Sequence, residues 1–116
     1  MSKRRQERRK YPRINKNLPL SIALKGADFV VETKNISCGG AYCHVDRYIK
    51  PLTKLAICIN LPDTKRNIFC KGVVVRTEEA VPTGYNIAIF FNEIDKKDLN
   101  VLSNYIHHHL AYEQIQ

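Results

Sequence analysis

Apolar residues alternate with polar ones along most of the chain, which is the period of a strand with one buried face. The first alternating run covers residues 18–24, and the polar segment 25–28 after it predicts a turn. Further strands are predicted at 29–34, 41–45, 55–61, 68–77 and 85–91. Six short strands at this spacing predict a small antiparallel barrel or a sandwich.

The segments between these runs carry residues that turn or bend a chain. Segment 35–40 is polar and ends in glycine, so we expect it to be a loop. Pro62 ends the fourth run, and Pro82 with Gly84 turns the chain into the last one. Gly72 lies inside the fifth run, where it predicts a bulge or a bend.

The last part of the chain has the period of a helix, which we predict at residues 95–112. Asp95 suits the N-cap, and Asp98 three residues later resembles a capping box with Asp in place of Glu. The predicted apolar face consists of Leu99, Leu102, Tyr105, Ile106 and Leu110. We expect this face to cover one end or one side of the β-structure.

The basic charge is concentrated at the N-terminus. The chain holds 19 Lys and Arg against 11 Asp and Glu, a net charge of +8. Residues 1–16 hold eight of the basic residues and one acidic residue, Glu7, which is +7, so the remaining chain is at +1. The sequence therefore predicts a mobile basic arm at 1–16 and a near-neutral domain at 17–112. Such an arm favours an anionic partner: a nucleotide, a nucleic acid or an anionic lipid.

Length and composition limit the class of protein. A chain of 116 residues with 44% hydrophobic residues can form one domain with a single core. Its apolar runs fall far short of the about 18 to 20 residues that a membrane span needs. The N-terminus is charged and has no apolar stretch, so we expect no secretory signal and a cytoplasmic location.

The four cysteines, Cys38, Cys43, Cys58 and Cys70, form no C-x-x-C pair. Without a secretory signal, free thiols are expected. Zinc bound by Cys38, Cys43 and His44 is one interpretation, but cysteines in β-structure more often serve as small buried hydrophobic residues. We therefore expect no metal site.

The sequence contains no recognisable catalytic arrangement. H-E-x-x-H, P-loop and dinucleotide-binding motifs are absent, and Gly39-Gly40 stands alone. Ser37 has no His and Asp partner nearby in the sequence. We predict a protein without enzymatic activity and without a cofactor.

Two motifs do stand out. The first is R-x-x-x-R, from Arg9 to Arg13, next to the first strand. The second is N-x-S-x-x-G, formed by Asn35, Ser37 and Gly40. In this order, with six predicted strands and a C-terminal helix, the sequence over residues 8–110 resembles the PilZ domain. That family is known for binding the bacterial second messenger cyclic di-GMP.

The resemblance implies a mainly β fold, a six-stranded antiparallel β-barrel with a C-terminal helix and a flexible basic N-terminal arm. It implies a cyclic di-GMP site made of Arg8, Arg9, Arg13, Asn35, Ser37 and Gly40. Guanidinium groups suit phosphate oxygens, the guanine O6 and N7 atoms, and stacking on bases. The amide oxygen of Asn35 suits guanine N–H groups, and the Ser37 hydroxyl can donate or accept. Gly40 would allow a positive φ and a close approach of the backbone.

Two residues bear on how the ligand is held. Many family members have Asp at the position of Asn35, and a neutral amide makes weaker hydrogen bonds than a carboxylate, so we expect reduced affinity. In this family an arginine at the position of Arg8 accompanies binding of an intercalated ligand dimer. We therefore expect two cyclic di-GMP molecules per site.

In this hypothesis the ligand fixes the arm over the barrel, and the signal passes to an unidentified effector protein. Motility and biofilm formation are common outputs of the family. One alternative is a barrel that binds single-stranded nucleic acid through the arm, although the barrel itself is nearly neutral, which makes nucleic acid the less favoured partner. Another is a PilZ-type adaptor that acts without a ligand, although the arginine motif is retained. The simplest alternatives are a solvated basic tail and an ordinary Asx-type turn at 35–40.

The aromatic residues also have two interpretations. Tyr11 either stacks on a base or packs on the barrel. The remaining candidates are expected in the core rather than in a stacking platform: Tyr42, Phe69, Tyr85, Phe90 and Phe91.

Overall fold

Alternation in the sequence becomes alternation in burial along each strand. The computed structural model describes residues 11–62 and 64–115. In β5, Leu55, Ile57 and Ile59 are buried, whereas Lys54 and Ala56 face outward. The strands are β1 (Arg13–Ile14), β2 (Pro19–Leu24), β3 (Ala27–Ser37), β4 (Gly40–Val45), β5 (Lys54–Leu61), β6 (Arg66–Glu79) and β7 (Tyr85–Ile94).

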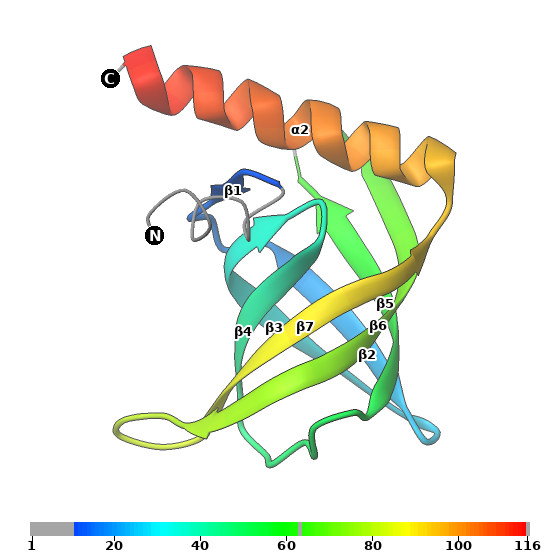
Figure 1. Cartoon of the computed structure of the whole chain (residues 1–116), viewed down its shortest axis with the longest axis vertical. Helices are drawn as coiled ribbons and strands as arrows, with labels where there is room; N and C mark the ends of the chain where they lie inside the picture. The colour runs from blue at the N-terminus through cyan, green and yellow to red at the C-terminus, as the bar shows by residue number, and fades with distance from the viewer. Residues whose placement is uncertain (1–10, 63, 116) are drawn as a thin grey trace, which may run out of the picture.

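The strands form one closed antiparallel sheet. Their order is β1-β3-β2-β5-β6-β7-β4, and a further pairing of β3 with β4 closes the ring. Within the described residues, the six longer strands thus form the predicted six-stranded antiparallel barrel (Figure 1). Closure lets the inward side chains of all six strands share one core.

The chain joins the sheet before residue 17. In β1, Arg13 pairs with Ser37 and Ile14 pairs with Ile36 of β3. Ile14 is buried, so the end of the predicted arm contributes to the core. Arg8, Arg9 and the rest of segment 1–10 lie outside the described residues.

The segment predicted as a loop at 35–40 is mostly strand. β3 continues through Ser37 and β4 begins at Gly40, which leaves Cys38 and Gly39 to make the turn. The polar side chains of this segment occupy outward positions, which a strand tolerates as well as a loop does. The predicted irregularity at Gly72 is confirmed, because the β6–β7 register shifts between Lys71 and Gly72.

The predicted helix is α2 (Lys96–Ile115), which lies across one end of the barrel and packs against β1 and β6 (Figure 1). Its predicted apolar face is confirmed: Leu102, Tyr105 and Ile106 are buried, and Leu99 and Leu110 pack against the core. Near the N-terminus of α2, the Asp98 carboxylate accepts a hydrogen bond of 3.3 Å from the Phe69 backbone N–H.

The cysteines are free thiols on or beside the strands. Cys38, Cys43 and Cys70 are buried, and Cys58 is half-buried. Burial raises the pKa of the Cys43 thiol to about 12, and burial raises the pKa of Cys70 to about 12 as well. These thiols are therefore protonated and poorly reactive at neutral pH.

Candidate ligand-binding site

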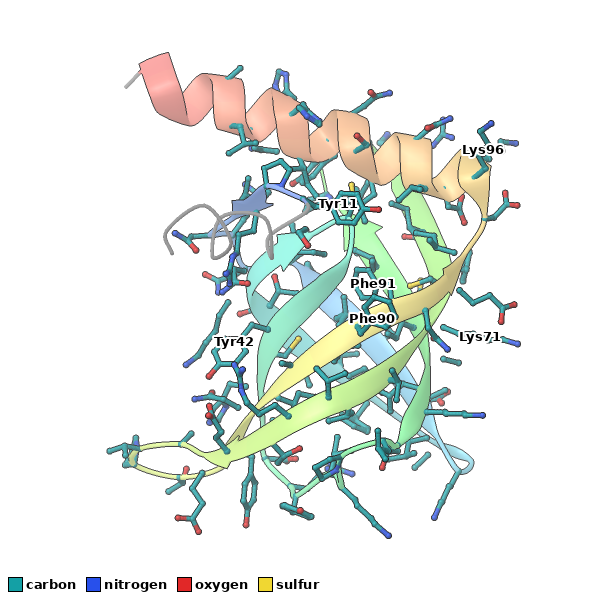
Figure 2. The ribbon with its side chains drawn as sticks, viewed as in Figure 1. Tyr11, Tyr42, Lys71, Phe90, Phe91 and Lys96 are labelled. Atoms are coloured by element: carbon teal, nitrogen blue, oxygen red, sulfur yellow. The ribbon has the colours of Figure 1, made fainter. Side chains whose placement is uncertain are left out.

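A cleft of about 490 Å³ lies where β1, β3, β4, β6 and β7 meet. Its lining includes the four predicted site residues that the structure describes: Arg13, Asn35, Ser37 and Gly40. The other lining residues are Tyr11, Gly39, Ala41, Tyr42, Arg76, Ala88 and Phe90. Figure 2 shows Tyr11 toward the α2 end of the barrel and Tyr42 farther from the helix.

Strand pairing positions Arg13 beside Ser37. The two residues are opposite each other in the β1–β3 register. Because Ile14 points into the core, its neighbour Arg13 points outward and is exposed. No ion pair joins Arg13 to an acid within the described residues, so its guanidinium is available to an anion.

A second set of residues forms a row across four strands. Asn35 of β3 pairs with Tyr42 of β4, Tyr42 pairs with Ala88 of β7, and Ala88 pairs with Arg76 of β6. Bulges in β3, after Thr33, and in β6, after Val74, set this alignment. Ala88 is the smallest member of the row, so the surface is low between Tyr42 and Arg76.

Cationic groups gather around the Tyr42 ring. The Arg76 guanidinium lies 5.8 Å and the Lys34 ammonium 5.9 Å from its centroid. Arg76 also lies 3.4 Å from a Glu78 carboxylate oxygen, and both groups are solvent-exposed. An exposed pair of this kind is weak, so Arg76 can turn toward another anion at small cost.

Ser37 shapes the turn between β3 and β4. Its Oγ accepts a hydrogen bond of 3.0 Å from the Gly39 N–H, and its hydroxyl lies 3.5 Å from the Gly40 carbonyl oxygen. The turn is therefore stabilised by a side chain, but by the Ser37 hydroxyl, whereas the alternative predicted from the sequence was an Asx-type turn. The same hydroxyl lines the cleft.

Gly40 is needed for a reason that differs from the expected one. Its φ is not positive; among the described glycines, positive φ occurs at Gly26 and Gly84. A Cβ on Gly40 would instead overlap the carbonyl oxygen of Ile89. The close approach is therefore made by β7, whose Phe91 N–H donates to the Gly39 carbonyl at 2.9 Å.

Tyr11 packs on the turn. A Cβ on Gly39 would lie 3.0 Å from the Tyr11 ring, so the ring covers this glycine. Tyr11 remains 42% exposed at the cleft. Of the two sequence-based interpretations, packing on the barrel is present, and stacking on a base stays a prediction.

The model of the PilZ domain matches residues 7–108 of the chain. The chain belongs to the PilZ domain family. PilZ domains are non-enzymatic receptors, and PilZ homologues bind cyclic di-GMP. No curated protein matches the chain.

Solved structures share the fold of this PilZ domain. The Bacillus subtilis inhibitor of motility, MotI/DgrA, has a TM-score of 0.82 and 22% identity, covering 90% of this chain and 52% of that one. The PilZ domain of YcgR from Escherichia coli, solved with c-di-GMP, has a TM-score of 0.74 and 15% identity, covering 93% and 97%. The K. pneumoniae MrkH–c-di-GMP complex has a TM-score of 0.78 and 15% identity, covering 91% and 54%. This PilZ domain spans about half the length of the MotI/DgrA and MrkH chains.

The two motifs of this PilZ domain meet at the cleft through Arg13 and the second motif's three residues. That these residues bind the ligand stays a prediction. Arg8 and Arg9 lie outside the described residues. Within the described residues, no group of three His, Cys, Asp or Glu side chains comes together as a metal site. Among the same described residues, no helix is both long enough and apolar enough to cross a membrane.

Three residues of the cleft were not predicted as site residues from the sequence: Tyr42, Arg76 and Phe90. The prediction that Phe69 and Phe90 lie in the core was wrong, because they are 63% and 50% exposed. Their neighbours in the sequence, Ile68, Cys70, Ile89 and Phe91, are buried. Strict alternation along β6 and β7 is therefore a signal that could have placed both rings outside.

Proposed function

We propose that this PilZ domain is a cytoplasmic receptor for cyclic di-GMP that passes the signal to a partner protein. The observation that carries the proposal is the shared cleft: Arg13, Asn35 and Ser37 line it from β1 and β3. Two of the solved structures with this fold, the YcgR domain and MrkH, are described as c-di-GMP complexes.

The cleft chemistry suits a cyclic dinucleotide. Arg13 has no acidic partner among the described residues and can pair with a phosphate or with a guanine O6 and N7. Asn35 offers an amide to the Watson–Crick edge of a guanine. Tyr42 and Arg76 offer flat faces for a second base.

In the proposed mechanism, the basic residues that precede β1 close on the ligand bound in the cleft. Arg8 and Arg9 add two guanidinium groups, and Arg8 holds the second molecule of an intercalated dimer. The fixed segment then covers part of the barrel and changes the surface that a partner meets. The partner is a separate protein of unknown identity, and motility and biofilm formation are the processes we propose to examine first.

The test is isothermal titration with cyclic di-GMP, with GTP and a short oligonucleotide as comparison ligands. We expect binding of cyclic di-GMP alone, with about two molecules per chain, and one molecule per chain for Arg8→Ala. Arg13→Ala should weaken binding about 10- to 100-fold, because a charge-assisted hydrogen bond is lost.

Arg47→Ala is the matched control. Arg47 is also exposed, but it pairs with Asp46 at 2.9 Å and stacks on Phe29, away from the cleft. Its loss should leave affinity unchanged. Equal affinities of the Arg13→Ala variant and the unaltered protein would refute the site, and heat with the oligonucleotide instead would favour nucleic-acid binding.

A further inference from the structure

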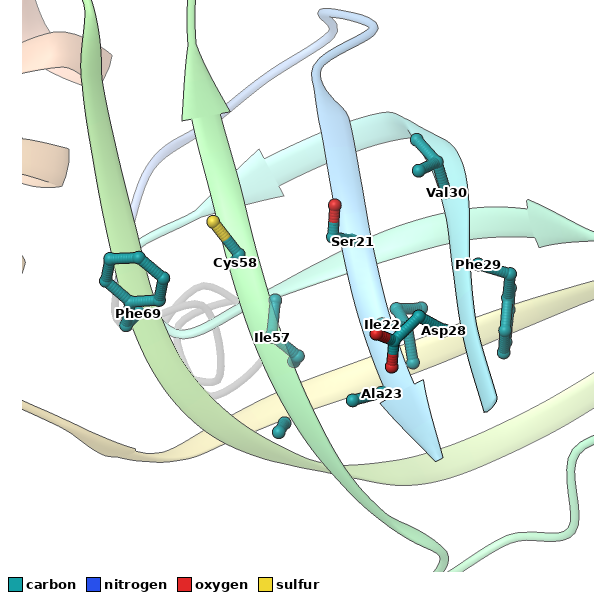
Figure 3. A pocket seen from close by; sticks show the side chains of 10 residues that line it. Ser21, Ile22, Ala23, Asp28, Phe29, Val30, Ile57, Cys58 and Phe69 are labelled. Atoms are coloured by element: carbon teal, nitrogen blue, oxygen red, sulfur yellow. The ribbon is translucent and has the colours of Figure 1, made fainter. Parts of the chain in front are cut away.

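The barrel has a second hollow, of about 350 Å³, over β2, β3, β5 and β6. It shares no lining residue with the ligand cleft. Figure 3 shows side chains from neighbouring strands around it, with Phe69 and Cys58 on one side and Val30 and Asp28 on the other. A partner that binds over this hollow would therefore leave the ligand cleft open.

Strand pairing arranges the surface around the hollow in two rows. The first row runs Phe69, Cys58, Ser21, Val30 from β6 through β5 and β2 to β3. The second row runs Lys71, Ala56, Ala23, Asp28 across the same strands. We call these eight residues the β2–β5 face.

The first row of the β2–β5 face is mostly apolar, and the two residues at its ends are exposed. Phe69 is 63% and Val30 is 68% exposed. Both middle strands carry small residues, so the larger side chains stand on either side of a shallow floor. Exposed apolar side chains grouped around a hollow commonly mark a contact with another protein.

The two rows are complementary to themselves. A two-fold axis that runs along the strands, between β2 and β5, places β6 of one copy over β3 of the other. Phe69 then meets Val30 of the second copy, and Lys71 meets its Asp28, each contact occurring twice. The small residues at the axis let the two faces come close. We propose that this face binds a second copy of the chain.

The charges on the β2–β5 face favour a second copy of the chain as its partner. Asp28 has no ion-pair partner among the described residues, and Lys71 has only an exposed pair with Glu93 at 3.8 Å. Such a pair holds its lysine weakly. The net charge outside residues 1–16 is only +1, so two barrels repel each other little.

The face is small, which sets the expected affinity. Four strands at about 4.8 Å spacing span about 14 Å, so the contact belongs with weak, transient interfaces. We expect a dimer with a Kd on the order of 10 to 100 µM. The dimer should form with or without cyclic di-GMP, because the cleft is separate.

Sedimentation velocity of the full chain tests the proposal, over about 5 to 500 µM protein. A thiol reductant is present throughout, so that a disulfide through Cys58 cannot account for a dimer. Asp28→Lys and Lys71→Asp should each weaken self-association at least about tenfold, because each places like charges together twice. An equimolar mixture of the two variants should dimerise again, since both contacts then join opposite charges.

Phe69→Ser should also give a monomer, and its thermal midpoint shows that it is folded. Glu79→Lys and Val81→Ser are the controls, because both residues are exposed but lie at the far end of β6 and in the loop after it. They should dimerise normally. A monomer at all concentrations would overturn the proposal. So would a dimer that persists in all three face variants, or mixed variants that fail to associate.

Discussion

At the scale of single residues, Gly40 shows how a motif position can have a structural cause. In Gly40→Ala, the new methyl group must overlap the Ile89 carbonyl, where two backbones meet. We expect a loss of about 2 kcal/mol or more in the free energy of unfolding. Urea denaturation measures it.

Gly39→Ala is the matched control for that experiment. Its methyl group would lie 3.0 Å from the Tyr11 ring, which is partly exposed and can shift. The loss should therefore be small. Equal losses at the two glycines would show that the contact with β7 does not explain Gly40.

The buried thiol of Cys43 gives a pH dependence with a definite sign. Burial raises its pKa from 9.0 to about 12. Below pH 9 the thiol is protonated in both states, so its contribution to stability is complete. Between pH 9 and about 12 it ionises only in the unfolded chain, so stability falls as pH rises.

Cys43→Ala should remove this contribution. We expect the free energy of unfolding to fall less steeply above pH 9 in the variant, by at most about 1.4 kcal/mol per pH unit. Denaturation at pH 8, 9 and 10 compares the slopes, and half-buried Cys58→Ala serves as the reference. Identical slopes for Cys43→Ala and the unaltered protein would contradict the prediction.

At the scale of elements, α2 supports the strand that carries Arg13. The helix packs against β1, and Leu102 is fully buried. Leu102→Ala should lower the free energy of unfolding by about 3 kcal/mol, because it removes core contacts and leaves a cavity. Exposed Asn104→Ala should cost little in the same denaturation experiment. A small loss at Leu102 would mean that the helix rests loosely on the barrel.

The elements were predictable because alternation and helical period are local properties. These patterns predicted the six long strands and the helix. The polar residues Asn35 and Ser37, however, were assigned to a loop. They lie in β3, past a bulge after Thr33. Arg76 was missed for a related reason: the β6 bulge after Val74 sets it opposite Ala88. Register across strands is a long-range property, and no short segment encodes it.

At the scale of the whole molecule, we expect the barrel to fold without the basic segment before it. The closed ring, the core of the described residues and α2 are all built from residues 11–115. A chain that begins at Tyr11 should keep the circular dichroism spectrum and thermal midpoint of the full protein. Its affinity for cyclic di-GMP should fall about 100-fold or more, because it lacks Arg8 and Arg9. Unchanged affinity would place ligand recognition entirely on the barrel.

Closure of the ring has one more consequence. Each of the six long strands has a hydrogen-bonded neighbour on both sides, and in the described chain only the two-residue β1 pairs on one side alone. Such a sheet therefore leaves little open edge at which a peptide could add a strand, the contact that drives many β-proteins into aggregates. Among the described strands, one such stretch remains in β3, where residues 27–32 pair with β2 alone. A protein that binds elsewhere on the barrel must recognise its side chains. Surface substitutions can therefore change its choice of partner while the backbone stays as it is.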